Sequence, residues 1–156
     1  MMNTNPDTSS YVTKVALEEA VFPAIETWPN LHPQREFTIC ITLPEFTSVC
    51  PKTGLPDFGT LVIEYAPQAL CIELKAFKYY LLAYRNVGIF YENVVNKVLE
   101  DVVVAIQPRW VRVTGTFSAR GGINTNAVAQ WHQGQDPEFK QLSAGALSQL
   151  RQTIHS

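Results

Sequence analysis

A chain of 156 residues is long enough for one domain with a hydrophobic core and too short for two ordinary domains. Its hydrophobic fraction of 46% and charged fraction of 17% are typical of a folded globular protein and exclude a disordered one. The formal net charge of -2 gives no general attraction to nucleic-acid phosphates or to an anionic membrane. We therefore expect a small-molecule substrate, and neither a nucleic acid nor a membrane as a direct partner.

The first ten residues are polar, and we expect them to form a mobile tail rather than a secretory leader. No apolar run approaches the roughly 20 residues that span a bilayer, so we expect a cytoplasmic protein. The three cysteines, Cys40, Cys50 and Cys71, show no Cys-x-x-Cys spacing, and the three histidines lie far apart in the sequence. This pattern predicts free thiols and no metal site.

Hydrophobic periodicity predicts two strands followed by two helices. Alternating residues indicate a first strand over 36–43, and residues 44–57 are so rich in proline and glycine that they predict a loop. A second strand follows over 60–65, with a short continuation at 70–72. An apolar stripe from Leu74 to Tyr84 predicts a helix that ends by Gly88, and apolar pairs every four residues predict a second helix from Phe90 to Val103.

Two further strands are predicted over 110–117 and 123–131, joined by a turn at Arg120-Gly121-Gly122, with a short helix near 144–151. We assign little structure to the residues before position 36. The order ββααββ predicts a single α+β domain, an antiparallel sheet with its helices on one face. Such a sheet leaves its edges exposed, so we expect oligomers that form by sheet extension.

Cys50 lies within the proline- and glycine-rich loop, in the sequence Phe-Thr-Ser-Val-Cys-Pro-Lys-Thr-Gly-Leu-Pro-Asp-Phe. The neighbouring cation of Lys52 favours a thiolate, which is the reactive form of a cysteine nucleophile. A single cysteine more often fills space, and the loop alone leaves both interpretations open. Cys40 and Cys71, in strand-like apolar contexts, fit the space-filling interpretation better.

Charged side chains supply further candidates. Asp57 is typical of a turn residue after a proline, but beside a reactive thiol it becomes a candidate acid. Glu92, at the start of the second helix, fits either a contact with the helix dipole or a hydrogen-bonding anchor for a guanine-like edge. The remaining candidates are cations that fit either a solvated surface or a phosphate contact: Lys75, Lys78, Arg85 and Arg120.

Eight consecutive residues, Glu73-Leu74-Lys75-Ala76-Phe77-Lys78-Tyr79-Tyr80, carry a specific pattern. They match without exception the hallmark of the NADPH-dependent 7-cyano-7-deazaguanine reductases of queuosine biosynthesis, Glu-(Ser/Leu)-Lys-(Ser/Ala)-hydrophobic-Lys-(Leu/Tyr)-(Tyr/Phe/Trp). The segments Cys50-Pro51-Lys52-Thr53-Gly54 and Pro56-Asp57-Phe58 resemble the catalytic loop of that family, and residues 85–86 and 90–92 continue the match. The chain therefore resembles this family over about residues 37–123.

The resemblance implies a tunnelling fold (T-fold), in which subunits join their sheets into a barrel, as a pentameric ring or a decamer. It also implies that Cys50 attacks the nitrile carbon of 7-cyano-7-deazaguanine to form a covalent thioimide, while Asp57 supplies a proton. Two equivalents of NADPH would then reduce the adduct to a primary amine. By resemblance, the substrate contacts are Ile72, Glu73, Leu74, Tyr91 and Glu92, and the cofactor contacts are Lys75, Lys78, Arg85 and Arg120.

Tyr91 departs from the family pattern, because many members have histidine immediately before the equivalent of Glu92. A tyrosine stacks or donates a hydrogen bond but carries no charge near neutral pH, so we expect no proton shuttle here. Three alternatives to a reductase stay open: a related enzyme that resolves the thioimide with ammonia to an amidine, a zinc-dependent cyclohydrolase or pterin enzyme of the same fold, and a noncatalytic binding module. The intact motif argues against the first, and the sparse histidines argue against the second.

Overall fold

Two long antiparallel hairpins form most of the main sheet in the computed structural model, which describes residues 15–134. The main sheet has six strands in the order β1-β6-β3-β4-β7-β8, and β2 and β5 pair separately. The strands are β1 (Val15–Ala16), β2 (Thr27–Pro29), β3 (Ile39–Val49), β4 (Pro56–Ala66), β5 (Leu70–Ile72), β6 (Val87–Gly88), β7 (Trp110–Arg120) and β8 (Ile123–His132). The predicted α+β fold with ββααββ order is confirmed by the long elements.

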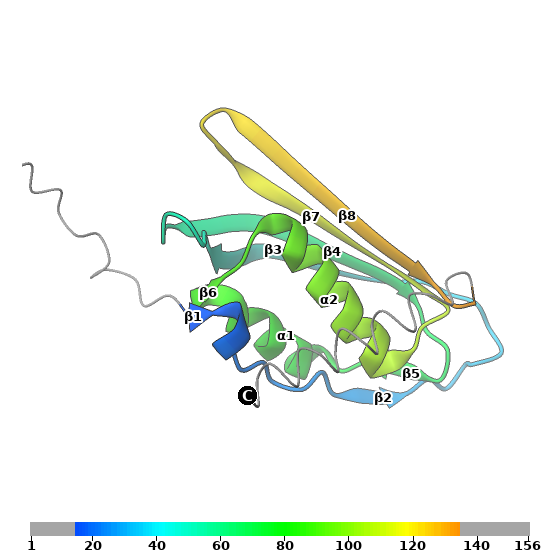
Figure 1. Cartoon of the computed structure of the whole chain (residues 1–156). Coiled ribbons are helices and arrows are strands. Elements are labelled where there is room, and N and C mark those ends of the chain that lie inside the picture. Colours follow the sequence, from blue (N-terminus) through cyan, green and yellow to red (C-terminus); the bar gives the residue numbers. More distant parts are fainter. Residues whose placement is uncertain (1–14, 135–156) are drawn as a thin grey trace, which may run out of the picture.

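The helices α1 (Leu74–Leu82) and α2 (Tyr91–Ile106) cover one face of the sheet (Figure 1). The 3-10 helix η3 (Ala83–Asn86) continues α1, and a second 3-10 helix, η2 (Leu17–Glu19), follows β1. Both apolar patterns seen in the sequence point into the core. The buried residues are Phe77, Tyr80 and Leu81 of α1, Tyr84 of η3, and Val94, Val95, Val98, Leu99, Val102 and Ile106 of α2. Leu74, which we expected in the same stripe, is 60% exposed.

The predicted loop over 44–57 is wrong for most of its length. β3 continues to Val49 and β4 begins at Pro56, so only residues 50–55 form the loop. Pro44 lies where the pairing register of β3 and β4 shifts, between Leu43 and Phe46. Prolines are tolerated at such irregularities and at the first residue of a strand, because no ladder hydrogen bond is lost there. Asp57 is therefore held by a strand rather than by a turn.

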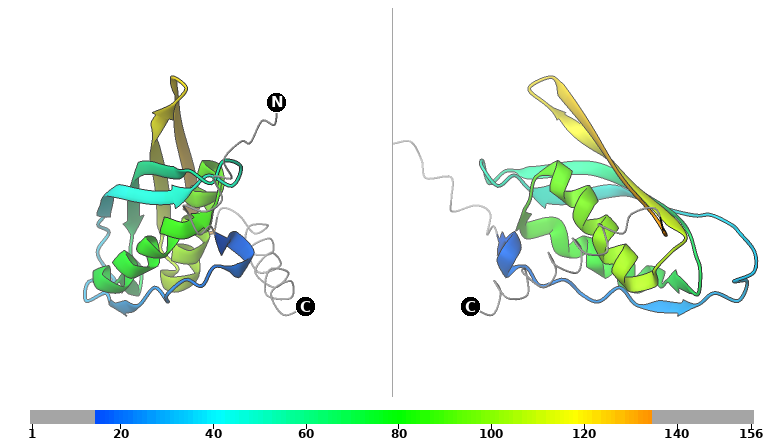
Figure 2. Two further views of the ribbon diagram at one scale, coloured as in Figure 1. Left: turned by 90° about the vertical axis from the view of Figure 1, so that its left-hand side faces the viewer. Right: turned by 45° about the vertical axis from the view of Figure 1, so that its right-hand side comes forward.

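The ends of the described region also differ from expectation. Residues before 36, to which we assigned little structure, include β1, η2 and β2. The expected tail at 1–10 and the expected helix near 144–151 lie outside the described residues. At the other side of the sheet, the turn end of the β7–β8 hairpin extends past the helices in every view (Figure 2). Within residues 15–134, no helix is long and apolar enough to cross a membrane.

Candidate active site

The loop between β3 and β4 holds Cys50 in a tight six-residue connection. The amide of Cys50 donates a hydrogen bond to the carbonyl of Leu55 at 2.9 Å, and the amide of Gly54 donates to the carbonyl of Cys50 at 2.9 Å. Gly54 has a φ of +70°, a conformation that side chains disfavour. Two main-chain bonds thus fix the backbone of the cysteine, whose side chain stays partly exposed.

The loop around Cys50 lowers the pKa of its thiol. A hydrogen bond from the side chain of Thr53 is the largest of the effects that lower its pKa from 9.0 to about 7, and partial burial opposes that effect. Backbone groups of the same loop and the side chain of Arg120 lower the pKa further. A thiol with this pKa is substantially ionised at neutral pH, as a nucleophile requires.

The other two cysteines lack such an environment. Cys71 is buried in β5, where desolvation raises the pKa of its thiol, so the space-filling interpretation is confirmed for it. Cys40 is exposed on β3, which makes that interpretation wrong for Cys40. Exposed residues alternate with partly buried ones along the first half of β3. Cys40 therefore lies on the face of the strand that points away from the core.

Asp57 and Arg120 bring a carboxylate and a guanidinium to the same place. Asp57 is only 4% exposed, and its Oδ1 forms an ion pair with Nη2 of Arg120. Arg120 also donates a hydrogen bond to the carbonyl of Pro56 at 3.0 Å and contacts the thiol of Cys50. The guanidinium therefore connects the nucleophile with the candidate acid. This position was predicted to contact cofactor phosphates, which stays a prediction.

A main-chain bond brings the start of α2 to the same cluster. The amide of Ile89 donates to the carbonyl of Val49 at 3.1 Å, just before the cysteine. Two residues later, the hydroxyl of Tyr91 donates to Oδ1 of Asp57 at 2.7 Å. Glu92 follows in the first turn of α2 with its side chain exposed. Four predicted residues that are distant in sequence, Cys50, Asp57, Tyr91 and Arg120, thus form one contact cluster, which we call the thiol cluster.

The predicted substrate residues at the start of α1 lie elsewhere. Ile72 is 2% exposed within the core, whereas Leu74 is largely exposed. Glu73 is the N-cap of α1, and its two carboxylate oxygens accept hydrogen bonds from the amides of Lys75 at 2.9 Å and Ala76 at 2.7 Å. These amides, above all that of Ala76, lower the pKa of Glu73. Its contacts within the chain are those of a helix cap.

Helix α1 separates this N-cap from the thiol cluster. Its nine residues span about 13 Å at 1.5 Å per residue. Figure 1 shows β5 and the loop between β3 and β4 at opposite ends of the molecule, and the right-hand view of Figure 2 agrees. Among the described residues, no hydrogen bond or ion pair joins Glu73, Lys75 or Lys78 to the thiol cluster.

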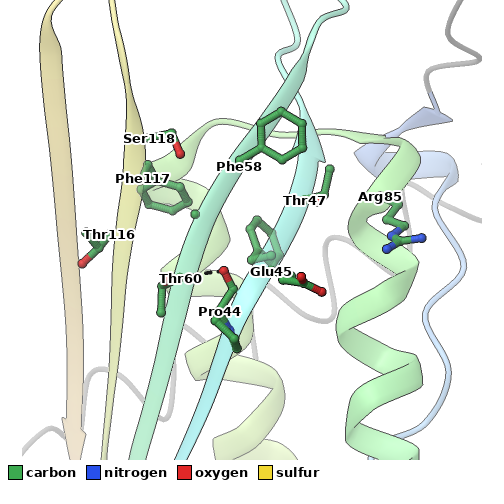
Figure 3. A pocket seen from close by; sticks show the side chains of 11 residues that line it. Pro44, Glu45, Thr47, Phe58, Thr60, Arg85, Thr116, Phe117 and Ser118 are labelled. Atoms are coloured by element: carbon green, nitrogen blue, oxygen red, sulfur yellow. Dashed lines mark hydrogen bonds between the residues drawn. The ribbon is translucent and has the colours of Figure 1, made fainter.

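A cavity of about 580 Å³ is lined by residues of β3, β4, β7 and η3 (Figure 3). Glu45 and Arg85 line one part of it, and Thr116 and Ser118 line another. Phe117 borders the cavity and also stacks on Tyr91, with ring centroids 3.9 Å apart. Arg85 is thus the one predicted cofactor contact that lines this cavity, while Lys75 and Lys78 are exposed on α1.

Three residues that the sequence analysis did not select belong to the site. Thr53 hydrogen-bonds the thiol, and Phe117 supports Tyr91. Ser48 is fully buried directly opposite Asp57, and its hydroxyl has no partner in the part of the chain that the structure describes. Ser48 and Thr53 both stand in the sequence quoted around Cys50, which is a usable signal, whereas Phe117 looks like an ordinary strand residue.

The described residues contain no group of three or more His, Cys, Asp or Glu side chains arranged to hold a metal ion. The thiol cluster instead combines a nucleophile, a carboxylate, and two hydrogen-bond donors. This set of groups suits covalent addition to an electrophilic carbon with proton transfer close by.

Comparisons with known proteins identify the family. The family model described as QueF-like protein matches residues 56–136. Proteins named NADPH-dependent 7-cyano-7-deazaguanine reductase are similar to this chain: that of Chloroherpeton thalassium is 55% identical, covering 69% of this chain and 92% of its own, and that of Elusimicrobium minutum is 54% identical, covering 73% and 86%. The protein of the same name from Chlorobium luteolum is 57% identical, covering 69% and 92%.

A solved structure supports the fold. The crystal structure of the archaeosine synthase QueF-Like in the apo form superposes with a TM-score of 0.58 at 27% identity, covering 64% of this chain and 96% of that one. The antiparallel hairpins and the two helices of this chain are consistent with a T-fold. On the identity and coverage of these matches, the chain belongs to the family of NADPH-dependent 7-cyano-7-deazaguanine reductases.

Proposed function

We propose that the protein reduces the nitrile of 7-cyano-7-deazaguanine to the primary amine of 7-aminomethyl-7-deazaguanine in queuosine biosynthesis, with NADPH as the source of hydride. The names of its relatives supply the substrate and the cofactor. The observation that carries the chemistry is the contact of Arg120 with both the thiol of Cys50 and the carboxylate of Asp57. A nucleophile with a pKa of about 7 and a buried acid are thereby held together.

The first step is the addition of a thiol across a carbon–nitrogen triple bond. The sulfur of Cys50 bonds to the nitrile carbon, one π bond breaks, and its electron pair goes to the nitrogen. The proton released from the thiol passes through Asp57 to that nitrogen, so the thioimide forms without net gain or loss of charge. A thioimide accepts hydride more readily than a nitrile, which is the gain from covalent catalysis.

Reduction then proceeds in two stages. NADPH held by this chain would supply the hydride that the carbon accepts at each stage, and a proton would go to the nitrogen each time. Between the stages, the carbon–sulfur bond would break with its electron pair going to sulfur, and a proton from the nitrogen would return to that sulfur, which leaves an imine and the thiol of Cys50. In balance, one nitrile, two NADPH and two protons give one amine and two NADP⁺, and the cysteine returns to its starting state.

Glu92 is the proposed anchor for the purine-like edge of the substrate. Its carboxylate is exposed in the first turn of α2, one residue after a member of the thiol cluster. A carboxylate at this place accepts hydrogen bonds from a ring N–H and an exocyclic amine, the donors of a guanine-like edge. The substrate would then be held by one helix end and attacked from the adjacent loop.

The cations of this chain fit the phosphates of NADPH. Lys75 and Lys78 are three residues apart on α1, so both side chains lie on one side of that helix. Arg85 lines the cavity beside Phe117, where a guanidinium suits bidentate contacts with a phosphate. Lys75, Lys78 and Arg85 are therefore the residues proposed to hold the cofactor, with Arg120 as a further candidate.

The distance between the two parts of the predicted site supports assembly from more than one subunit. Glu73 and Lys75 lie at one end of α1, whereas the thiol cluster lies beyond its other end. If both sets serve one reaction, a second copy must supply one of them. Strand β8 is an edge of the main sheet and offers unpaired backbone groups to a neighbouring subunit. We therefore propose a ring of subunits with joined sheets, a pentamer or a decamer.

Mixed rings test this shared site. Subunits carrying Cys50→Ala and subunits carrying Lys75→Ala would each be inactive alone. Random mixing of equal amounts would leave both native groups at about a quarter of the interfaces of a closed ring. We expect reductase activity to return toward that fraction, with the ring size measured by solution mass. If mixed rings stay inactive although both variants assemble, the shared site is wrong.

The reaction itself is tested with the purified full chain and 7-cyano-7-deazaguanine. Without NADPH we expect a covalent adduct by mass spectrometry and a new near-ultraviolet absorption band. Both signals should be absent in Cys50→Ala and present in Cys40→Ala, the matched control at an exposed cysteine of β3. An adduct that survives in Cys50→Ala would overturn the assignment of the nucleophile.

With NADPH added, two equivalents should be consumed for each amine formed. The structural similarity to an archaeosine synthase suggests one alternative product. Ammonia would convert the same thioimide into an amidine. Incubation with ammonia and substrate, analysed by product mass, distinguishes the two. An amidine formed without NADPH oxidation would reject the reductase proposal while leaving Cys50 as the nucleophile.

A further inference from the structure

Tyr91 is fixed at both its ring and its hydroxyl. It is the first residue of α2, and its hydroxyl donates a hydrogen bond to Oδ1 of Asp57 at 2.7 Å. Its ring stacks on Phe117 with an interplanar angle of 12° and a centroid separation of 3.9 Å. Because the hydroxyl of Tyr91 donates its proton to the carboxylate of Asp57, it cannot donate that proton to a ligand at the same time. This arrangement differs from the substrate contact that the family resemblance implies for this position.

Two glycines make room for the ring that supports Tyr91. A Cβ atom at Gly59 of β4 would lie 2.8 Å from the ring of Phe117, and one at Gly115 of β7 would lie 2.7 Å from it. Contacts this short are essentially never tolerated, so larger residues at either position would displace the ring. Phe117 is itself 3% exposed. The orientation of Tyr91 is thus set by the sheet beneath it.

The two oxygens of Asp57 have different environments. Oδ1 accepts the hydrogen bond of Tyr91 and also forms the ion pair with Arg120. Both of these contacts are made by the same oxygen, and the residue as a whole is 4% exposed. One oxygen is therefore anchored, while the other is left for the reacting groups. Anchoring matters because a proton donor is effective only when held within hydrogen-bond reach of its acceptor.

We infer that Tyr91 is a positioning residue for Asp57: its hydroxyl holds Oδ1 so that Oδ2 faces the nitrogen that is protonated when Cys50 adds to the nitrile. The inference rests on the proposed function and assigns Tyr91 to the acid rather than to the substrate. Burial, together with the contact to Asp57, raises the pKa of Tyr91 to about 12. Its hydroxyl therefore remains a neutral donor at every pH at which the thiol is active, whereas an imidazole in this position would change its charge near neutral pH.

The test uses Tyr91→Phe, which removes the hydroxyl and keeps the ring. The matched control is Tyr84→Phe, because Tyr84 is a buried tyrosine whose hydroxyl is hydrogen-bonded to Tyr80 away from the site. Three quantities are measured on the full chain: the melting temperature, the affinity for 7-cyano-7-deazaguanine without covalent reaction in a Cys50→Ala background, and the rate of adduct formation at saturating substrate as a function of pH.

For Tyr91→Phe we expect the rate of adduct formation to fall about tenfold, the loss of one hydrogen bond to a charged group, at every pH. The midpoint of the pH profile should stay at the thiol pKa, and the noncovalent affinity should change by less than about twofold. Tyr84→Phe should leave the rate and affinity unchanged. Tyr91→His supplies an N–H donor and should restore the rate at least in part, with an additional pH dependence near the imidazole pKa.

Three outcomes contradict the inference. An unchanged rate in Tyr91→Phe would show that Asp57 needs no anchor. A loss of affinity with an unchanged rate at saturation would make Tyr91 a substrate contact. An equal rate loss in Tyr84→Phe would indicate a general loss of packing. A wild-type protein that forms no adduct at all would instead overturn the proposed function, so the two failures are distinguishable.

Discussion

The side chain of Thr53 hydrogen-bonds the thiol of Cys50 three residues before it, and this contact does more than any other to lower the pKa of that thiol. The same hydroxyl accepts a hydrogen bond from the amide of Leu55 at 3.3 Å, which keeps it in place within the loop. The loop between β3 and β4 thus activates its own cysteine before any substrate arrives. Thiolate formation depends on a residue that carries no charge.

Replacement of Thr53 by valine should raise the pKa of Cys50 from about 7 toward the ordinary value of 9.0. Because the thiolate is the reactive form, alkylation of Cys50 by iodoacetamide at pH 7 should slow several-fold, roughly threefold or more. The measurement is the rate of alkylation against pH, followed by peptide mass spectrometry. Thr42→Val, at an exposed position on β3, is the control and should leave the midpoint unchanged. A midpoint that does not move in Thr53→Val would contradict this account.

Ser48 carries a buried hydroxyl without a hydrogen-bond partner in the described region, opposite Asp57. Leaving such a group unsatisfied costs about 1 kcal/mol or more. Ser48→Ala should therefore raise the free energy of unfolding by about 1 kcal/mol, as measured by urea denaturation of the full chain. A decrease of that size would mean that the hydroxyl makes a stabilising contact in the folded protein.

Glu73→Gln tests the structural role of the first residue of the family motif. The glutamate caps α1 with both oxygens, whereas glutamine offers one acceptor oxygen. Since the helix amides lower the pKa of Glu73, its contribution to stability is present above its unfolded pKa of about 4.5 and is lost as the pH falls through the lower folded value.

The melting temperature of Glu73→Gln should accordingly lie below that of the wild type by a few degrees at pH 7. The difference should shrink below about pH 4.5 and disappear in stronger acid. Glu18→Gln, at an exposed residue of η2, is the control and should show no such dependence. A difference that persists unchanged to low pH would show that the carboxylate does not act as a cap.

Gly115→Ala should displace the ring of Phe117, because the added methyl group would overlap both that ring and the side chain of Val95. Overpacking of this kind costs about 1 to 3 kcal/mol. Phe117→Leu provides space, so the double variant should lose less stability than the sum of the two single variants, as measured by a double-mutant cycle in urea. Additive losses would show that the glycine and the phenylalanine are not coupled.

Much of the fold could be predicted from the sequence because its long elements follow simple periods. The apolar pairs from Val94 to Val103 gave the position of α2, and the order of the long strands was correct. The loop between β3 and β4 is shorter than the sequence predicts, because Pro44 and Pro56 do not break the strands. Both lie where a sheet accommodates proline, at a register shift and at a first residue, and such places depend on pairing with another strand.

The candidate site was predictable to the extent that a short motif carries it. Cys50 and Asp57 stand seven residues apart, and the structure brings them to one cluster through Arg120. The partner of Asp57 at position 120 could not be predicted from local sequence, since 63 residues separate the two. Phe117 was likewise hidden, because its contact with Tyr91 depends on packing between a strand and a helix end.

The bond from the amide of Ile89 to the carbonyl of Val49 has a consequence for how this site changes over evolution. It joins the segment that carries the nucleophile to the segment that leads into α2, and only main-chain atoms take part. Side chains at these two positions are thus free to drift among apolar residues that fill the same space, while the spacing between the two segments is inherited intact.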